Sequence, residues 1–194
     1  MTDEDRSGSP TATAAAAVLP LSSGHWTLDP DASAVTFTVR KVGIIKVGGR
    51  FTEVRADLHI GERAEATRVD AEIALASFDT GNAKRDTHVR SGDMLDVEKR
   101  PTLSFRATEV SGQGEDWTMA GDMTIGEVTR PVSFAVTFGG VSPSSVDQRK
   151  RAAFTATGEI RRGDFGLGFA PGIIGSVVKV RLDMRFVEPQ DQSA

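Results

Sequence analysis

From Trp26 onward, apolar and polar residues alternate along most of the chain with a period of two. A β-strand points successive side chains to opposite faces of a sheet, so this pattern predicts strands with one apolar and one solvent-facing side. Clusters of Gly, Asp, Ser or Pro separate the runs, which favours antiparallel strands joined by turns. The alternation predicts an all-β fold of about eight or nine strands. The runs cover residues 35–39, 54–60, 69–75, 103–107, 117–125, 132–138, 154–160 and 178–186.

A helical pattern is expected only for residues 82–91 of the 194-residue chain. No other helix is therefore expected to cover the apolar face of the sheet. The sheet has to fold over as a sandwich or close as a barrel, and closure also removes exposed strand edges. Residues 139–150 are expected to form a polar hairpin loop, and residues 163–175 an irregular glycine-rich loop. Alternation alone leaves open whether such a barrel is filled by side chains or hollow.

The composition narrows the classes of function. A formal net charge of −4 argues against nucleic acid as a partner, because nucleic-acid-binding domains usually carry a basic surface. The absence of cysteine excludes disulfides, thiolate metal sites and a cysteine nucleophile. No stretch approaches the ~20 apolar residues of a membrane-spanning helix, so we expect no transmembrane segment. The oligomeric state is left open, a homodimer included.

The two termini differ in composition from the alternating part of the chain. Residues 14–21 form a short apolar run, but three acidic residues and only one arginine precede it. A secretory signal favours a positively charged start, so we expect a cytoplasmic protein rather than an exported one. Residues 1–23 are rich in Ala, Ser, Thr and Pro, which predicts a disordered tail. The barrel is expected at residues 24–188, and a short C-terminal tail at residues 189–194.

Five short motifs punctuate this pattern. They are Trp26-Thr27-Leu28-Asp29-Pro30, Gly49-Arg50-Phe51, the polar segment 80–91, the hairpin segment 121–132 and Arg161-Arg162-Gly163-Asp164-Phe165-Gly166. In this order they resemble the signatures of the YceI-like family, which is described as polyisoprenoid-binding and lipocalin-like. Arg40-Lys41 stands where that family often has a histidine, and Met94 and Leu95 replace aromatics, so the exact ligand stays open.

The resemblance implies an extended antiparallel β-barrel of about eight strands, lipocalin-like, with one short helical segment and a long apolar lumen. It also implies that the chain binds and carries or stores an extended apolar lipid: an isoprenoid, a polyprenyl phosphate or an isoprenoid quinone. No other cofactor is expected, and no enzymatic activity. The side chains expected to line the lumen lie on the apolar faces of their strands: Phe37, Ile73, Phe105, Phe134, Phe154 and Leu182.

The polar segment 80–91 holds the candidate residues for a lipid head group, namely Asn82, Arg85, Asp86 and His88. A guanidinium offers several donors in a rigid fork that suits a phosphate or carboxylate. Asn82 and His88 could add hydrogen bonds at the mouth of the barrel. An alternative is that Arg85 and Asp86 pair with each other and only close one end of the barrel.

Two other functions stay open at this point. The loop of Arg85, Asp86 and His88 could belong to an enzyme acting on a lipid or a small acid, although no nucleophile motif accompanies it. A barrel with a filled core could instead serve as an interaction module. His25, His59 and His88 are the only histidines, and their positions do not predict a shared metal site.

Overall fold

The computed structural model describes residues 19–189. Its single α-helix in this range is α1 (Ala83–Arg90), and short 3₁₀ helices lie at η1 (Ala64–Ala66), η2 (Leu75–Ser77) and η3 (Arg162–Phe165). The remaining elements are the strands β1 (Gly24–Leu28), β2 (Ala34–Lys41), β3 (Ile45–Phe51), β4 (Val54–Ile60), β5 (Arg68–Ala74), β6 (Phe78–Asp79), β7 (Thr102–Gln113), β8 (Asp116–Ile125), β9 (Val128–Pro143), β10 (Lys150–Arg161) and β11 (Ile174–Val187).

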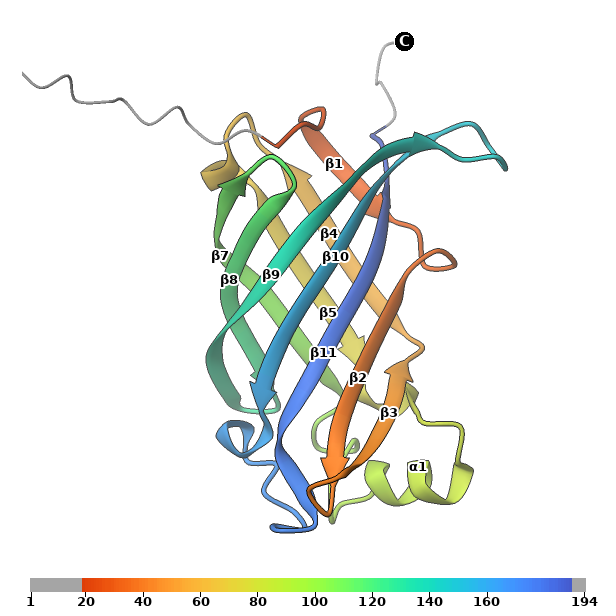
Figure 1. Cartoon of the computed structure of the whole chain (residues 1–194), viewed down its shortest axis with the longest axis vertical. Coiled ribbons are helices and arrows are strands. Elements are labelled where there is room, and N and C mark those ends of the chain that lie inside the picture. Colours follow the sequence, from red (N-terminus) through yellow and green to blue (C-terminus); the bar gives the residue numbers. More distant parts are fainter. Residues whose placement is uncertain (1–18, 190–194) are drawn as a thin grey trace, which may run out of the picture.

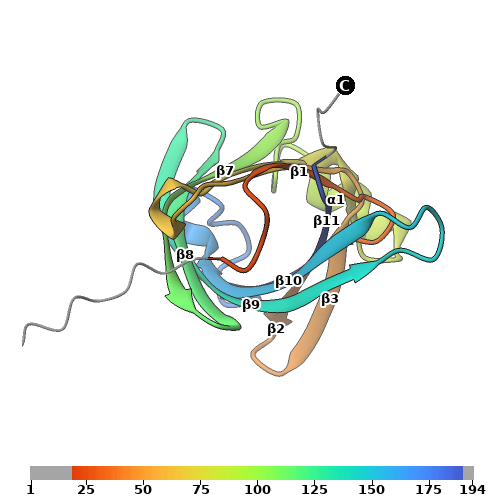
Figure 2. The ribbon, with the colours of Figure 1, turned by 90° about the horizontal axis from the view of Figure 1, so that it is seen from above.

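Eight of these strands close into an antiparallel barrel, as the resemblance implied (Figure 1). The order is β1-β4-β5-β7-β8-β9-β10-β11, and β11 pairs back to β1. The edge of β11 that pairs with β1 at Phe186 and Val187 also pairs with β2, over residues 174–183. Strands β3 and β6 follow β2 in the same sheet. Figure 2 looks into the resulting ring of strands. Closure pairs the backbone groups that would otherwise form two open edges.

The expected alternation is present in the strands. In β4, Ala56, Leu58 and Ile60 are buried, whereas the residues between them are exposed. Each barrel strand thus turns one row of apolar side chains inward and one polar row outward. The inward rows form two buried clusters, one around Trp26 and one around Phe105 and Phe165 near α1. The apolar core therefore runs along the whole barrel.

The predicted bounds of two loops need correction. The ladder of β9 and β10 continues as far as the pair Pro143 and Lys150, so the predicted loop at residues 139–150 shrinks to residues 144–149. The polar composition does not prevent pairing here, because strands pair through backbone hydrogen bonds. Both faces of this projecting hairpin are exposed to solvent and can carry polar side chains. The helix is found where it was expected. Residues 163–175 are irregular as expected, apart from η3 and the start of β11.

The described part of the chain contacts the barrel before the expected barrel boundary at residue 24. Residues 19–23 cross the end of the barrel opposite α1, seen as the red segment in Figure 2. Leu19 is only 7% exposed and belongs to the core cluster around Trp26. The Trp26 indole Nε1 donates to the Ser22 carbonyl at 2.9 Å and fixes this segment. The rest of the predicted N-terminal tail, residues 1–18, and residues 190–194 lie outside the described residues.

The helices of the described range are short. None of them combines the length and the apolar character that a membrane-crossing helix requires.

Candidate functional site

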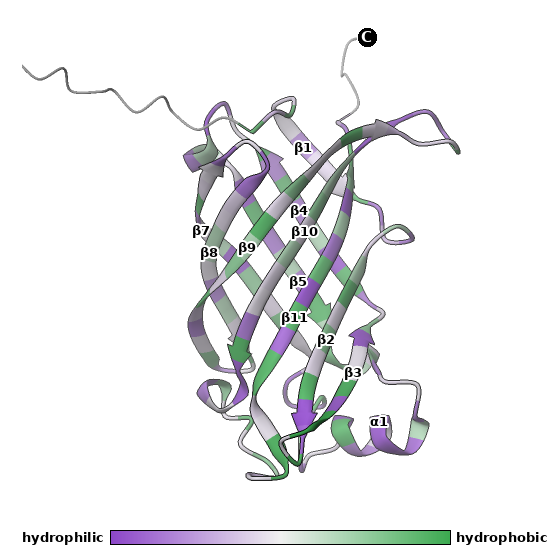
Figure 3. Cartoon of the chain, viewed as in Figure 1, coloured by the Kyte–Doolittle hydropathy of each residue, from purple (hydrophilic) through white to green (hydrophobic). Residues whose placement is uncertain are grey.

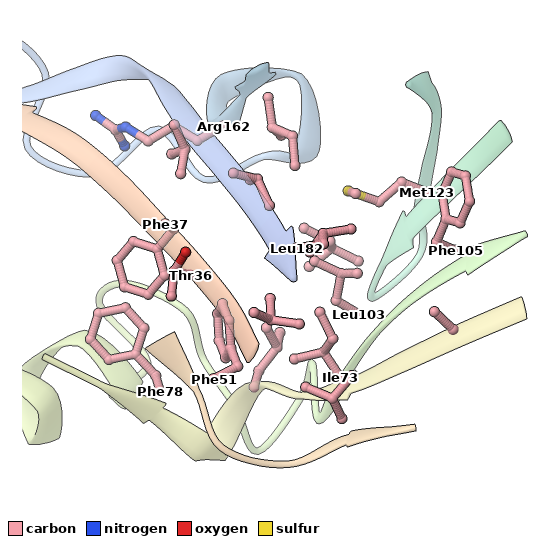
Figure 4. A pocket seen from close by; sticks show the side chains of 18 of the residues that line it. Thr36, Phe37, Phe51, Ile73, Phe78, Leu103, Phe105, Met123, Arg162 and Leu182 are labelled. Carbon is pink, nitrogen blue, oxygen red and sulfur yellow. The ribbon is translucent and has the colours of Figure 1, made fainter. Parts of the chain in front are cut away.

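The barrel encloses a cavity of about 650 Å³ that runs from Leu19 at one end to the segments around α1 at the other. Figure 4 shows some of the side chains that line it. Its wall is almost entirely apolar, and side chains of both buried clusters line it. The barrel is therefore hollow rather than filled. All six side chains expected to line a lumen do so: Phe37, Ile73, Phe105, Phe134, Phe154 and Leu182.

Inward-facing glycines explain how large aromatic residues leave the lumen open. Gly158 lies beside Phe134 on the neighbouring strand, and a Cβ at this glycine would come within 2.7 Å of the Phe134 ring. The same relation holds for Gly49, where a Cβ would lie 2.4 Å from the Phe37 ring. Each phenyl ring thus lies against the barrel wall, in the space that a side chain at the neighbouring glycine would occupy. Substitution of these glycines would push the rings toward the lumen.

Ionisable residues line the cavity only at the α1 end. They are Lys41 at the end of β2, Arg85 and His88 on α1, Asp93 in the following loop, and Arg162 at the start of η3. Three of the five carry a permanent positive charge, and one carries a negative charge. The lumen therefore combines a long apolar interior with a cationic end, which is the arrangement that an amphiphile with an anionic or polar head would require.

The four predicted head-group residues fall into two pairs. Arg85 and His88 line the cavity, whereas Asn82 and Asp86 do not. The Asn82 side chain caps α1, because its Oδ1 accepts a 3.0 Å hydrogen bond from the amide of Arg85. Any role of these residues toward a head group stays a prediction.

Thr80 connects Arg85 with Asp86, so the direct pair considered above is absent. Arg85 Nε donates to the Thr80 hydroxyl at 2.7 Å, and its Nη2 donates to the Thr80 carbonyl at 3.1 Å. Asp86 is 5% exposed and accepts hydrogen bonds from the Thr80 hydroxyl and amide. Burial alone would raise the pKa of Asp86, but the two bonds from Thr80 outweigh it and hold the pKa below its ordinary value. Asp86 is therefore an acceptor-only carboxylate that shapes the loop and leaves Arg85 with unused N–H groups.

Arg162 is a cavity residue that belongs to the fifth motif, but no role at the site was expected for it from the sequence. It is 7% exposed, and its guanidinium donates to the carbonyls of Leu167, Ile174 and Gly175. It also lies 4.6 Å from the ring centroid of Phe169. Burial lowers the pKa of Arg162, and no carboxylate within residues 19–189 forms an ion pair with it. Arg162 therefore holds the loop before β11 in place and adds positive charge to this end of the lumen (Figure 4).

The histidines do not converge. His25 and His59 face each other across β1 and β4, and His25 Nε2 lies 2.9 Å from Asp57 Oδ1 on the outer wall. His88 belongs to α1 at the other end of the barrel (Figure 1). Within the part of the chain that the structure describes, no three His, Asp or Glu side chains gather as a metal-binding group. The His88 ring also has no hydrogen-bonding partner among these residues.

A closed antiparallel barrel around an apolar lumen defines the protein as a hollow, lipocalin-like β-barrel. The YceI-like domain model matches residues 26–186, and the chain belongs to the YceI-like family. Protein YceI of Escherichia coli is 33% identical over 134 residues, which are 69% of this chain and 70% of that protein. A UPF0312 protein of Pseudomonas aeruginosa is 30% identical over 151 residues, or 77% of this chain and 78% of the relative.

Solved structures support the same fold. BcnA of Burkholderia cenocepacia is similar with a TM-score of 0.72 at 19% identity, over 81% of this chain and 98% of that one. A polyisoprenoid binding domain from Saccharophagus degradans has a TM-score of 0.67 at 16% identity, over 87% of this chain and 100% of that domain. At these identities the likeness establishes the architecture alone.

Proposed function

We propose that the protein binds an extended apolar lipid in its lumen and carries or stores it, without catalysing a reaction. The ligand class is an isoprenoid lipid, a polyprenyl phosphate or an isoprenoid quinone. The observation that carries the proposal is the apolar cavity of about 650 Å³ inside the closed barrel. Its size falls within the ~300–1,000 Å³ typical of small-molecule sites. The description of the Saccharophagus degradans domain as polyisoprenoid-binding supports the same class of ligand.

Burial of hydrocarbon would supply most of the affinity. Each CH₂ group removed from water contributes about 0.8 kcal/mol, so a long chain needs few polar contacts. The head group would lie at the α1 end, where Arg85, His88 and Arg162 line the cavity. Arg85 is the best placed to bind a phosphate, because Thr80 orients its guanidinium and no carboxylate within residues 19–189 pairs with it.

The test compares two ligands that differ only in the head group, a polyprenyl phosphate and the matching polyprenol. Arg85→Ala is expected to weaken binding of the phosphate at least tenfold, since a hydrogen bond to a charged group is worth about 1.5–3 kcal/mol. Binding of the polyprenol should change little. Lys84→Ala is the matched control, because Lys84 precedes Arg85 on the same helix but does not line the cavity.

Two outcomes would count against this assignment. Equal losses for both ligands would mean that Arg85 only maintains the Thr80 loop. Failure of the wild-type protein to bind either ligand would contradict the lipid-binding function itself. Titration by the change in tryptophan fluorescence suits the measurement, because Trp117 lines the cavity.

A further inference from the structure

Four large apolar side chains are exposed to solvent at the α1 end of the barrel. Six large apolar side chains are exposed within residues 19–189, and four of them lie in or beside two adjoining loops. Val42 and Ile44 belong to the β2–β3 turn, Ile45 is the first residue of β3, and Ile173 belongs to the loop before β11. The Val42 amide donates a 2.7 Å hydrogen bond to the Ile173 carbonyl, so the loops are in contact. We call these four residues the apolar tip; it lies at the bottom of Figure 1.

The apolar tip presents its side chains to solvent at a conformational cost. Ile44 is 81% exposed at the point of the turn. Val42 has a φ of 50°, in the left-handed region that β-branched residues rarely adopt and that Asn, Asp or Gly occupies more easily. The turn thus carries a valine where a polar turn residue would fit better. A contiguous exposed apolar group of this kind commonly marks an interaction surface.

Three exposed basic residues flank the apolar tip, and we call them the basic rim. Arg40, Lys41 and Lys46 are exposed in the same hairpin, and residues 40–48 contain no acidic residue. The other loop contributes residues 165–178, which contain no charged residue at all. In Figure 3 green loops lie beside the purple end of β2 at this pole of the molecule. An apolar centre flanked by a hairpin that carries only positive charges is complementary to an anionic lipid surface.

We propose that the apolar tip and its basic rim dock the barrel on an anionic lipid bilayer. The surface is continuous with the lumen, because Lys41 and Ile173 also line the cavity. Docking would therefore bring the cationic end of the lumen against the bilayer that holds the ligand. This step rests on the lipid-binding function proposed above. A second copy of the chain fits less well, since a two-fold contact would bring the three cations close to the same cations of the partner.

Vesicle flotation with the full chain tests the proposal. Vesicles of phosphatidylcholine and phosphatidylglycerol in equal amounts should retain the wild-type protein at low salt, whereas pure phosphatidylcholine should retain much less. Lys46→Glu should weaken binding about fivefold or more, because one cation near an anionic surface contributes about that factor. Ile44→Ser should weaken binding at least as much, because it removes an apolar side chain that would leave water on docking. Neither Lys46 nor Ile44 lines the cavity. Val146→Ser is the matched control, since Val146 is 91% exposed at the opposite end of the barrel.

The outcomes separate docking from lipid binding. Loading from detergent-dispersed lipid should be unchanged in Ile44→Ser, and this is measured in parallel. Equal binding of wild-type protein to neutral and anionic vesicles would overturn the docking proposal, as would an effect of Val146→Ser as large as that of Ile44→Ser. A dimer in sedimentation analysis that Ile44→Ser dissociates would assign the apolar tip to a second copy instead. Absence of lipid loading in the wild-type protein would refute the proposed lipid-binding function. Vesicle binding is measured separately, so its result would still decide the docking proposal.

Discussion

The hollow lumen can be tested by filling part of it with a larger side chain. Ala156 lies on the inner face of β10 between Val136 and Leu182, and all three side chains line the cavity. In Ala156→Trp the indole would extend into the open space. If the indole displaces one isoprene unit of about five carbons, the lost burial at ~0.8 kcal/mol per carbon amounts to about 4 kcal/mol. Lipid affinity should then fall on the order of 10³-fold.

The stability of the lipid-free protein distinguishes a hollow barrel from a filled one. Overpacking of a filled core costs about 1–3 kcal/mol, and each kcal/mol lowers Tm by about 2–4 °C in a chain of this size. A hollow lumen should accept the indole with a smaller change in Tm. Thr157→Trp is the control, because Thr157 is the next residue of β10 and is exposed on the outer face. Unfolding of Ala156→Trp, or lipid affinity equal to that of Thr157→Trp, would refute the reasoning.

Three further predictions concern the wall, one end and the β9–β10 loop. Gly158→Ala should turn the Phe134 ring into the lumen and lower lipid affinity, because the new Cβ would lie 2.7 Å from that ring; titration measures this. Leu19→Ser should lower Tm by about 4–8 °C in calorimetry, since losing a buried leucine costs about 2 kcal/mol. The hydrogen bond from Arg151 lowers the pKa of Asp147 from 3.8 to about 2, so this carboxylate stabilises the fold above pH 3.8 and loses that effect as the pH falls through about 2. The Tm difference between wild type and Asp147→Asn should therefore be full at pH 7, shrink below pH 3.8 and vanish below about pH 2.

Each of these predictions has a contradicting result. Gly163→Ala is the control for the wall, because no atom lies within 4 Å of a Cβ there, and an equal effect at Gly163 would exclude ring displacement. An unchanged Tm in Leu19→Ser would show that the segment before β1 adds nothing to the core. A Tm difference for Asp147→Asn that persists below pH 2 would exclude the ion pair with Arg151 as its cause.

Local patterns in the sequence predicted the elements of the fold well. The alternation at residues 54–60 corresponds to β4, and the polar segment 82–91 contains α1. Such features depend on neighbours along the chain, so the sequence exposes them directly. The closed and hollow form came from the resemblance instead, because alternation is equally compatible with a filled barrel.

Features that depend on distant contacts were not predictable in this way. The relation of Gly158 to Phe134 requires the register between β9 and β10, which no local pattern specifies. In the sequence, nothing distinguishes Arg162 from the other charged residues near it. Its burial arises only when the loop before β11 folds over it. The same holds for Thr80, whose hydroxyl binds both Arg85 and Asp86 across a turn. The sequence therefore indicated apolar side chains that line the lumen and the region of the polar end, but not which polar side chains face the cavity.

The central claim is that the lumen holds an extended apolar lipid, and mass spectrometry of an organic extract of the gently purified protein tests it most directly. The extract of the wild-type protein should contain a long-chain isoprenoid lipid in an amount approaching one molecule per chain. The extract of Ala156→Trp, prepared in the same way, should contain little of it or a shorter homologue. An empty wild-type extract, or equal amounts of the same lipid from both proteins, would contradict the claim.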